Sequence, residues 1–477
     1  STKSAMLTAA ASSRALNRVD AAGRVEAVTA DLRDLPPGAA RGAPLTFDLE
    51  GDPIRAFEGE PVAVALHAAG VSTLGRSSKY HRPRGAFCLD GHCASCYLRI
   101  DGQPNRRACA TLARDGLRCE RQNAFPSAEV DLLTAADWLF PEGMDHHTLM
   151  TGSRVGNALF LKLVREMGGS GTLPDASPGH APPVRDEALD VCVVGAGPAG
   201  LAAARAVAES APGARVAVFD EQPTPGGSLL ALAGGTARAA ALAQAAARAG
   251  ARLEGGATAL AYYPEDPGPS GAPGVLAVAT ADGLRRVSAR RFLYATGGYD
   301  QNLPFIDNDR PGVISARACG RLAFHWGVRP VPAGERVIVV DGAPTAAPLA
   351  RALAAAGVEV EVIDLSRERV VEARGATRVR GLVVEGRAGG SRRVDGTLVA
   401  IATPPSPASE LPRQHGARVR FEPARGGFVA LVDETHATSA LGVFACGDVT
   451  GYAGPEAAAR AGTAAGRAVA ESLRTKT

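Results

Sequence analysis

The feature that most constrains this chain is a group of four cysteines, Cys88, Cys93, Cys96 and Cys109. They are separated by four, two and twelve residues, which is the spacing of a plant-type [2Fe-2S] loop. Three thiolates on one tight loop and a fourth from a neighbouring segment can hold two irons, and Gly91 lets the backbone approach an inorganic sulfide. The alternatives are a zinc site, which usually needs a second Cys-x-x-Cys unit or histidines, and buried free thiols. The spacing favours the iron-sulfur cluster and therefore one-electron transfer.

Length and composition limit the remaining possibilities. A chain of 477 residues is too long for one simple core and indicates about three domains. With 46% hydrophobic residues, 21% charged residues and a net charge of +3, it is expected to be a soluble globular protein that binds neither nucleic acid nor membranes. No apolar run is long enough for a membrane span and the first residues lack a signal-peptide core, so a cytoplasmic location is expected. The other cysteines are scattered singly, which argues against a disulfide framework: Cys119, Cys192, Cys319 and Cys446.

Composition and hydrophobic periodicity divide the first part of the chain into three segments. Residues 1–43 have weak periodicity and form an extension whose structure is not predicted. Residues 44–167 begin with a strand at PLTFDLEG, a turn, and a helix at EPVAVALHAAG, followed by the cysteine loop. This order predicts a ferredoxin-like β-grasp domain and a following helical segment. Residues 168–187 are so rich in glycine and proline that we expect a linker.

A dinucleotide-binding motif follows this linker. An apolar strand over residues 189–194 leads into Gly195, Gly197 and Gly200, and an alanine-rich helix comes next. The first glycine permits a tight turn, the second allows close approach of a pyrophosphate, and the third lets the helix pack on the strand. The next strand ends at Asp220, whose carboxylate is placed to bind ribose hydroxyls, with Glu221 as the alternative. These residues predict a Rossmann-type nucleotide site.

Two later segments favour FAD as the nucleotide. One strand ends at Thr296 and Gly297, and another ends at Gly447 and Asp448 before a second alanine-rich helix. Such a turn can place the Asp448 carboxylate beside a ribityl hydroxyl; the alternative is that Asp448 only caps the helix. The FAD domain is therefore predicted over residues 188–310 and 425–477.

A second nucleotide-type fold is predicted over residues 311–424. Its strand, helix and strand are clear in RVIVVDGAPTAAPLARALAAAGVEVEVIDLS, but its turn reads Asp341-Gly342-Ala343-Pro344. Side chains stand where backbone would have to approach a pyrophosphate, and Asp341 adds negative charge near the phosphates. We expect this half to keep the fold and to bind NAD(P) poorly.

Three segments resemble a known family of enzymes: GRSSKYHRPRG (75–85), DEQPTPGGSLL (220–230, which includes Gly227) and ATGGYDQNLPFIDNDRPGV (295–313). They are similar to the alpha subunit of heterotetrameric sarcosine oxidase and its relatives, which include octopine and nopaline oxidases, proline and hydroxyproline dehydrogenases, and hydrogen cyanide synthase. The resemblance implies an α/β flavoprotein with two dinucleotide-binding domains, as in disulfide reductases. It also implies a flavoprotein beta subunit that carries the substrate site for an amine or amino acid. Members differ over whether the first site holds FAD, NAD or an adenine nucleotide, and several carry FMN at a subunit interface.

The sequence departs from sarcosine oxidase in two ways. The cluster cysteines directly follow HRPRG, as in the [2Fe-2S]-bearing relatives, and the chain stops at Thr477 without a folate-binding domain. Loss of the folate-binding domain argues against transfer of a one-carbon unit to folate. The cluster favours a dehydrogenase that passes electrons onward to an acceptor over an oxidase that reduces oxygen. No catalytic base is predicted, since His81, His146 and His147 carry no motif and isolated histidines are usually structural.

Three functions therefore remain to be compared. The first is the electron-transfer subunit of a heteromeric amine or amino-acid dehydrogenase, an oxidoreductase that acts on CH-NH or CH-NH2 donors only with its partner. The second is a stand-alone NAD(P)H-dependent flavin and iron-sulfur reductase, and the third is a non-catalytic nucleotide-binding scaffold.

Overall fold

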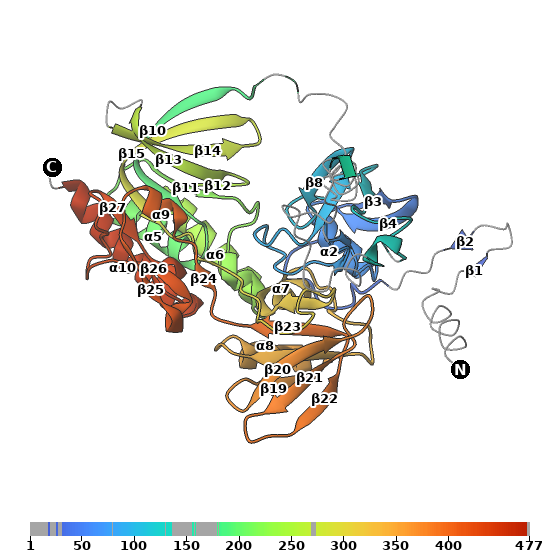
Figure 1. The fold of residues 1–477 in the computed structure, drawn as a ribbon. Helices are drawn as coiled ribbons and strands as arrows, with labels where there is room; N and C mark the ends of the chain where they lie inside the picture. The colour runs from blue at the N-terminus through green and yellow to red at the C-terminus, as the bar shows by residue number, and fades with distance from the viewer. Residues whose placement is uncertain are drawn as a thin grey trace, which may run out of the picture.

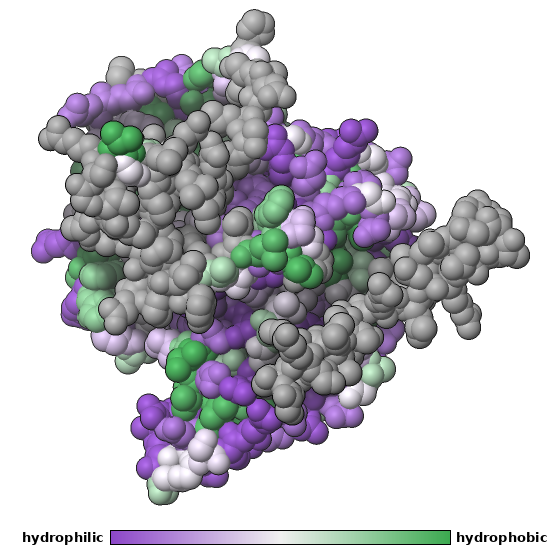
Figure 2. All heavy atoms as spheres, turned by 45° about the vertical axis from the view of Figure 1, so that its right-hand side comes forward, coloured by the Kyte–Doolittle hydropathy of each residue, from purple (hydrophilic) through white to green (hydrophobic). Residues whose placement is uncertain are grey.

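The structure is a computed structural model with three α/β domains (Figure 1). It describes residues 18–19, 25–26, 31–78, 80–128, 130–135, 155–156, 158, 179, 181–268 and 273–474. Within these residues, no helix is long and apolar enough to cross a membrane. The described surface on the face shown in Figure 2 is mostly hydrophilic, with small hydrophobic groups scattered over it.

The cysteine-rich domain is a five-stranded sheet with one helix packed against it. Apolar side chains of the helix, among them Ala65 and Leu66, share a buried core with Phe47 and Leu98 of the sheet. The strand order is β4-β3-β9-β7-β8, and the predicted ferredoxin-like fold is confirmed. The elements are β3 (Pro44–Leu49), β4 (Asp52–Phe57), α2 (Val62–Ala68), β7 (Tyr97–Ile100), β8 (Gln103–Arg107) and β9 (Arg118–Glu120). A two-stranded sheet of β5 (Gly75–Arg76) and β6 (Pro83–Arg84) precedes the cysteine loop, and β1 (Arg18–Val19), β2 (Val25–Glu26) and η1 (Leu132–Thr134) lie outside the domain sheet.

The first nucleotide-type domain has a seven-stranded sheet in the order β12-β11-β10-β15-β14-β13, with β27 added beside β15. Helices α5 and α10 pack closely because Gly462 and Gly466 lie against the backbone of Ala199 and Ala203. The strands are β10 (Val184–Val194), β11 (Val216–Asp220), β12 (Arg252–Gly255), β13 (Thr258–Pro267), β14 (Pro273–Thr280), β15 (Gly283–Tyr294) and β27 (Val443–Ala445). The helices are α5 (Pro198–Ser210), η2 (Gly227–Ala231), α6 (Gly235–Arg248), η5 (Gly447–Thr450) and α10 (Pro455–Arg474).

Strand β10 begins earlier than the sequence predicted. It starts at Val184, so the last residues of the predicted linker 168–187 are part of the sheet. Three of these four residues are charged and three are exposed, but they pair in register with β15 from Leu284 onward. Charge pairs also join the two strands, such as Arg286 with Asp186 at 2.9 Å. Composition alone missed this end of the strand because backbone pairing and ion pairs, not burial, hold it.

The second nucleotide-type domain lies between the two halves of the first in sequence. Its parallel sheet has the order β17-β23-β18-β19 and is accompanied by a three-stranded antiparallel sheet, β20-β21-β22. The elements are β17 (Val313–Ser315), α7 (Ala316–Gly320), η3 (Arg321–His325), β18 (Arg336–Asp341), α8 (Ala346–Ala355), β19 (Glu359–Asp364), β20 (Glu368–Arg374), β21 (Gly381–Gly386), β22 (Ser391–Asp395) and β23 (Leu398–Ala402). Connecting elements are β16 (Gly298–Tyr299), β24 (Ser406–Pro407), α9 (Glu410–Gln414), β25 (Val419–Glu422), η4 (Pro423–Arg425) and β26 (Gly427–Ala430).

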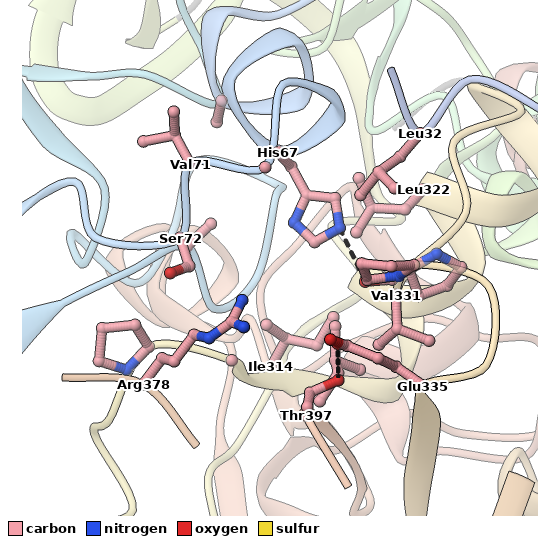
Figure 3. A pocket seen from close by; sticks show the side chains of 18 of the residues that line it. Leu32, His67, Val71, Ser72, Ile314, Leu322, Val331, Glu335, Arg378 and Thr397 are labelled. Carbon is pink, nitrogen blue, oxygen red and sulfur yellow. Dashed lines mark hydrogen bonds between the residues drawn. The ribbon is translucent and has the colours of Figure 1, made fainter. Parts of the chain in front are cut away.

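The end of the N-terminal extension joins the cysteine-rich domain to the second nucleotide-type domain. Leu32 and Leu35 are buried in the core that contains the β18 and α8 side chains. The Leu32 amide donates to the carbonyl of Ala68 at 2.9 Å, at the end of α2. Figure 3 shows a small pocket of about 80 Å³ at this junction, where His67 donates from Nε2 to the carbonyl of Pro330 at 3.0 Å. Residues 31–43 of the extension are thus part of the domain packing, which the weak periodicity did not indicate.

A buried histidine near this junction predicts a pH-dependent stability. His325 is 2% exposed, and burial together with nearby Arg321 lowers its pKa to about 4. The unfolded chain therefore takes up this proton first, so stability is lost as the pH falls below about 6.5, by about 1.4 kcal/mol per pH unit. Between pH 6.5 and pH 5, the free energy of unfolding of His325→Gln should fall by about 2 kcal/mol less than that of the parent protein. Urea unfolding followed by tryptophan fluorescence measures this, and identical pH slopes in the two proteins would contradict it.

Candidate functional site

The four predicted ligand cysteines come together at one end of the cysteine-rich domain. Cys88, Cys93 and Cys96 lie on the loop before β7, and Cys109 follows β8. The Sγ atoms of Cys96 and Cys109 are 3.3 Å apart, and Cys88 makes side-chain contacts with both Cys93 and Cys109. Three of the thiols are buried and Cys93 is partly exposed. The four sulfurs that the sequence spacing predicted as cluster ligands therefore lie close together in the structure.

The loop conformation directs backbone groups at these sulfurs. Leu89, Gly91 and Ala94 have positive φ angles of 49°, 83° and 58°, which is costly for the two residues that are not glycine. The amide of Asp90 donates to Cys88 Sγ at 3.4 Å. Left-handed turns of this kind fold the chain tightly around a group held by the cysteines.

The electrostatics of the four sulfurs fit a thiolate-bound metal cluster. Contacts with Cys109 and Cys93 lower the pKa of Cys88, whereas the pKa of Cys109 is raised because Cys88 and Cys96 lie beside it. Negative charge on one sulfur thus opposes ionisation of the next, and bound cations remove that conflict. In a [2Fe-2S] cluster each iron takes two of the four cysteines. Over the described residues, no group of three or more histidine, cysteine or carboxylate side chains could hold a single metal ion.

The three glycines of the motif, two between β10 and α5 and one in the first turn of α5, have the geometry that the motif requires. Gly195 has φ +104°, and a Cβ there would lie 2.3 Å from the carbonyl oxygen of Ala295. A Cβ on Gly200 would lie 1.8 Å from the Gly195 oxygen, so close packing demands glycine. A Cβ on Gly197, in contrast, would meet only the Gly227 Cα at 4.0 Å. Gly197 therefore faces open space at the N-terminus of α5, where a pyrophosphate fits.

Asp220 and Glu221 have different surroundings. Asp220 is directed at the glycine turn: its Oδ2 accepts from the Ala196 amide at 2.5 Å and its Oδ1 from the Gln222 amide at 2.8 Å. Burial raises its pKa. Glu221 lies beside His92, with Oε1 and Nε2 3.1 Å apart. Asp220 thus stabilises the turn through two backbone amides. The Glu221 carboxylate instead pairs with a side chain, that of His92.

Two adjoining cavities of about 510 and 100 Å³ lie beside the glycine turn. Most of the predicted residues line one or both of them: Gly195, Gly197, Asp220, Glu221, Gly227, Thr296, Gly297 and Asp448. Gly200 and Gly447 lie behind the surface and serve packing, since a Cβ on Gly447 would lie 2.7 Å from the Ala199 Cβ. Asp448 is in η5, while α10 begins at Pro455, so capping of α10 does not explain Asp448. Burial raises the Asp448 pKa, an effect that Arg317 opposes.

The cavity also contains residues that the sequence did not suggest. Asp90 and His92 of the cysteine loop line it, together with Arg317 and Arg321 from α7 and η3. Arg317 binds the Asp300 carboxylate and donates to the carbonyl of Gly298 at 2.6 Å. A third cavity, of about 340 Å³, is lined by both Cys109 and Glu221 and so extends from the cluster cysteines to the nucleotide site. No motif could reveal these residues, because they come from other domains.

His81, one of the three histidines considered above, does not line these cavities. His81 is 1% exposed and its Nδ1 lies 2.8 Å from the carbonyl of Asn123 and 3.2 Å from the Asp131 carboxylate. It therefore has a structural environment within the cysteine-rich domain. His146 and His147 lie outside the described residues.

The second nucleotide-type turn differs from the first. A Cβ on Gly342 would lie 2.9 Å from both the Ala402 oxygen and Leu365 Cδ1, so Leu365 covers the turn. Burial and nearby Asp364 raise the pKa of Asp341. None of the cavities named above is lined by this turn.

Comparisons with known proteins agree with both halves of the site. A 2Fe-2S iron-sulfur cluster binding domain matches residues 42–124, and a pyridine nucleotide-disulphide oxidoreductase domain matches residues 189–377. Sarcosine oxidase subunit alpha of Rhizobium meliloti (strain 1021) is 33% identical over 73% of this chain and 37% of its own length. Hydrogen cyanide synthase subunit HcnA of Pseudomonas aeruginosa is 42% identical over 18% of this chain and 84% of its own length. The chain thus spans little more than a third of the sarcosine oxidase subunit.

A solved structure has the same fold over nearly the whole chain. The crystal structure of L-proline dehydrogenase from P. horikoshii has a TM-score of 0.69 and 20% sequence identity, covering 93% of this chain and 77% of its own. The predicted fold class is therefore confirmed, and the matched domains indicate a [2Fe-2S] cluster and FAD as cofactors.

Proposed function

We propose that this chain, which is similar to sarcosine oxidase subunit alpha, is an oxidoreductase and serves as the electron-transfer subunit of a heteromeric amine or amino-acid dehydrogenase. The observation that carries the proposal is the shared cavity: Asp90 and His92, on the loop with the cluster cysteines, line the same space as Gly195 and Gly197. A two-electron carrier and a one-electron carrier held this close suit a relay between them. The substrate, a compound with a CH-NH or CH-NH2 group, is oxidised mainly on a partner flavoprotein subunit.

The residues divide between the two cofactors. Cys88, Cys93, Cys96 and Cys109 hold the cluster. The Gly195 and Gly197 backbone and the N-terminus of α5 hold the pyrophosphate of FAD. Glu221 receives the ribose hydroxyls, since the Asp220 oxygens already accept backbone amides.

Two further charged side chains line the cavity. The Asp448 carboxylate and Arg317 border the part towards η5 and α7. They are the groups placed to contact the ribityl chain. When bound, FAD supplies two-electron chemistry and the cluster supplies one-electron transfer; the chain's own residues bind, orient and enclose them.

Purification with and without the partner subunit tests this function. Visible spectra are recorded before and after adding candidate amines or NADH. Bleaching by an amine only when the partner is present is the expected result. Bleaching by NADH alone would instead identify a stand-alone reductase, and material without a flavin band would identify a nucleotide-binding scaffold.

The second nucleotide-type domain should bind NAD(P)H poorly. Leu365 covers the turn and Asp341 adds negative charge where phosphates would lie. We therefore expect no reduction of the flavin by NADH or NADPH at micromolar concentrations, as followed by the loss of flavin absorbance. Rapid bleaching by either nucleotide would contradict this expectation.

A further inference from the structure

The cysteine loop forms one wall of the nucleotide cavity. Asp90 and His92 lie in sequence between Cys88 and Cys93, and both line the cavity that contains Gly197. The His92 ring pairs with the Glu221 carboxylate at 3.1 Å and contacts the Tyr299 ring with centroids 4.7 Å apart. The loop is therefore held by the nucleotide-type domain as well as by its own.

A continuous set of hydrogen bonds runs from this loop to the glycine turn. The Gln222 side chain donates from Nε2 to the carbonyl of Asp90 at 3.1 Å. The Gln222 amide donates to one oxygen of Asp220, and the other oxygen accepts from the Ala196 amide. Ala196 lies within the glycine turn, so a shift of the turn is passed to the cysteine loop through two residues.

A buried cation fixes the other side of the loop. Arg321 is 5% exposed; its Nη2 lies 2.8 Å from Asp90 Oδ2 and its Nη1 lies 3.5 Å from the carbonyl of Cys88. Because Arg321 also lines the nucleotide cavity, one side chain contacts a cluster ligand residue and borders the nucleotide. Ion pairs that are shielded from water in this way hold geometry more firmly than surface pairs.

We propose that cluster and nucleotide bind cooperatively, because each holds the shared loop in the conformation that the other requires, with His92 and Gln222 as positioning residues. This inference rests on the proposed function, since it takes FAD as the nucleotide. Such coupling is reciprocal at equilibrium: if the nucleotide stabilises cluster binding by a given free energy, the cluster stabilises nucleotide binding by the same free energy.

Iron release from the full-length chain tests the coupling. The cluster-loaded protein, freed of nucleotide, is exposed to an iron chelator with and without saturating FAD, and the cluster absorbance is followed. We expect FAD to slow the release at least about fivefold in the parent protein. In His92→Ala this protection, measured at an FAD concentration that saturates the variant, should fall to near unity.

A second variant is needed because a substitution in the cysteine loop, such as His92→Ala, could prevent the cluster from assembling. Gln222→Met removes the bond to Asp90 from the nucleotide-type domain and leaves the cysteine loop unchanged, and it should also lose the protection. Glu50→Gln is the control, since it removes the charge from the pair with Arg121 (2.5 Å) in the cysteine-rich domain, and neither residue lines the cavity. It should keep the full protection.

The outcomes separate this inference from the function it rests on. Equal release rates with and without FAD in a parent protein that binds FAD would overturn the coupling and leave the proposed function standing. Full protection in both His92→Ala and Gln222→Met would also overturn the assigned roles. A parent protein that binds no FAD in equilibrium dialysis would overturn both proposals.

Discussion

Cys96→Ala should yield a protein with almost no iron or acid-labile sulfide, where the parent contains about two irons per chain. Cys96 is buried with its sulfur 3.3 Å from that of Cys109, so alanine removes a ligand that no neighbouring residue replaces. We expect electron transfer to a one-electron acceptor to fall more than about 100-fold, which exceeds the usual effect of losing a group that only supports a metal ligand. The flavin band should remain at saturating FAD, because the nucleotide turn belongs to another domain, although the coupling proposed above weakens FAD binding in this variant.

The same domain offers a control for this prediction. Cys119 is also buried, in β9, but lies among apolar core side chains, and burial raises its pKa to about 12. Cys119→Ala should keep the iron content of the parent and lose only on the order of 1 kcal/mol of stability. Iron and sulfide analysis distinguishes the two variants. Equal iron content in Cys96→Ala and the parent would remove the basis for a cysteine-held cluster.

Gly197→Val should abolish FAD binding while the protein still folds. Its backbone, at φ −73° and ψ −176°, suits valine, and no atom lies closer than 4.0 Å to the added Cβ. The side chain occupies the space into which a pyrophosphate would fit against α5. We expect the affinity for FAD to fall on the order of 100-fold or more, which corresponds to about 2.7 kcal/mol. Flavin content after gel filtration and a titration with FAD measure the loss.

Gly200→Ala, in contrast to Gly197→Val, should destabilise the fold. Its Cβ would lie 1.8 Å from the backbone oxygen of Gly195, so strand and helix must separate, at a cost of about 3 kcal/mol or more. A lower melting temperature is expected for Gly200→Ala and a near-parental one for Gly197→Val. If Gly197→Val retained FAD with parental affinity, the assignment of this turn to the pyrophosphate would be wrong.

Several parts of the structure followed from local sequence. The strand, turn and helix before the cysteine loop, and the strand-glycine-helix unit at residues 189–210, are each set by residues close together in the chain. For the same reason Gly195, Gly197 and Gly200 could be given separate roles before any geometry was known. The predicted start of β10 was late because Val184 and its polar neighbours carry no apolar pattern; their partner, β15, is far away in sequence.

The role of Asp220 could not be predicted from the local sequence. Its place at the end of β11 made it the first candidate for ribose, with Glu221 as the alternative. Only the structure shows that both Asp220 oxygens accept backbone amides from the glycine turn and the next residue. The hydrogen-bond partners of a carboxylate depend on which backbone groups the fold brings near it.

The sequence by itself determined the chemistry of each half: cysteine spacing specified the cluster, and the glycine turn with its strand and helix specified the nucleotide, because both motifs act within a short stretch of chain. Tertiary structure alone decided that the halves share a cavity, that His92 faces Glu221 and that Arg321 holds Asp90. These contacts join residues separated by more than a hundred positions. They arise from the packing of whole domain surfaces, which no local pattern encodes.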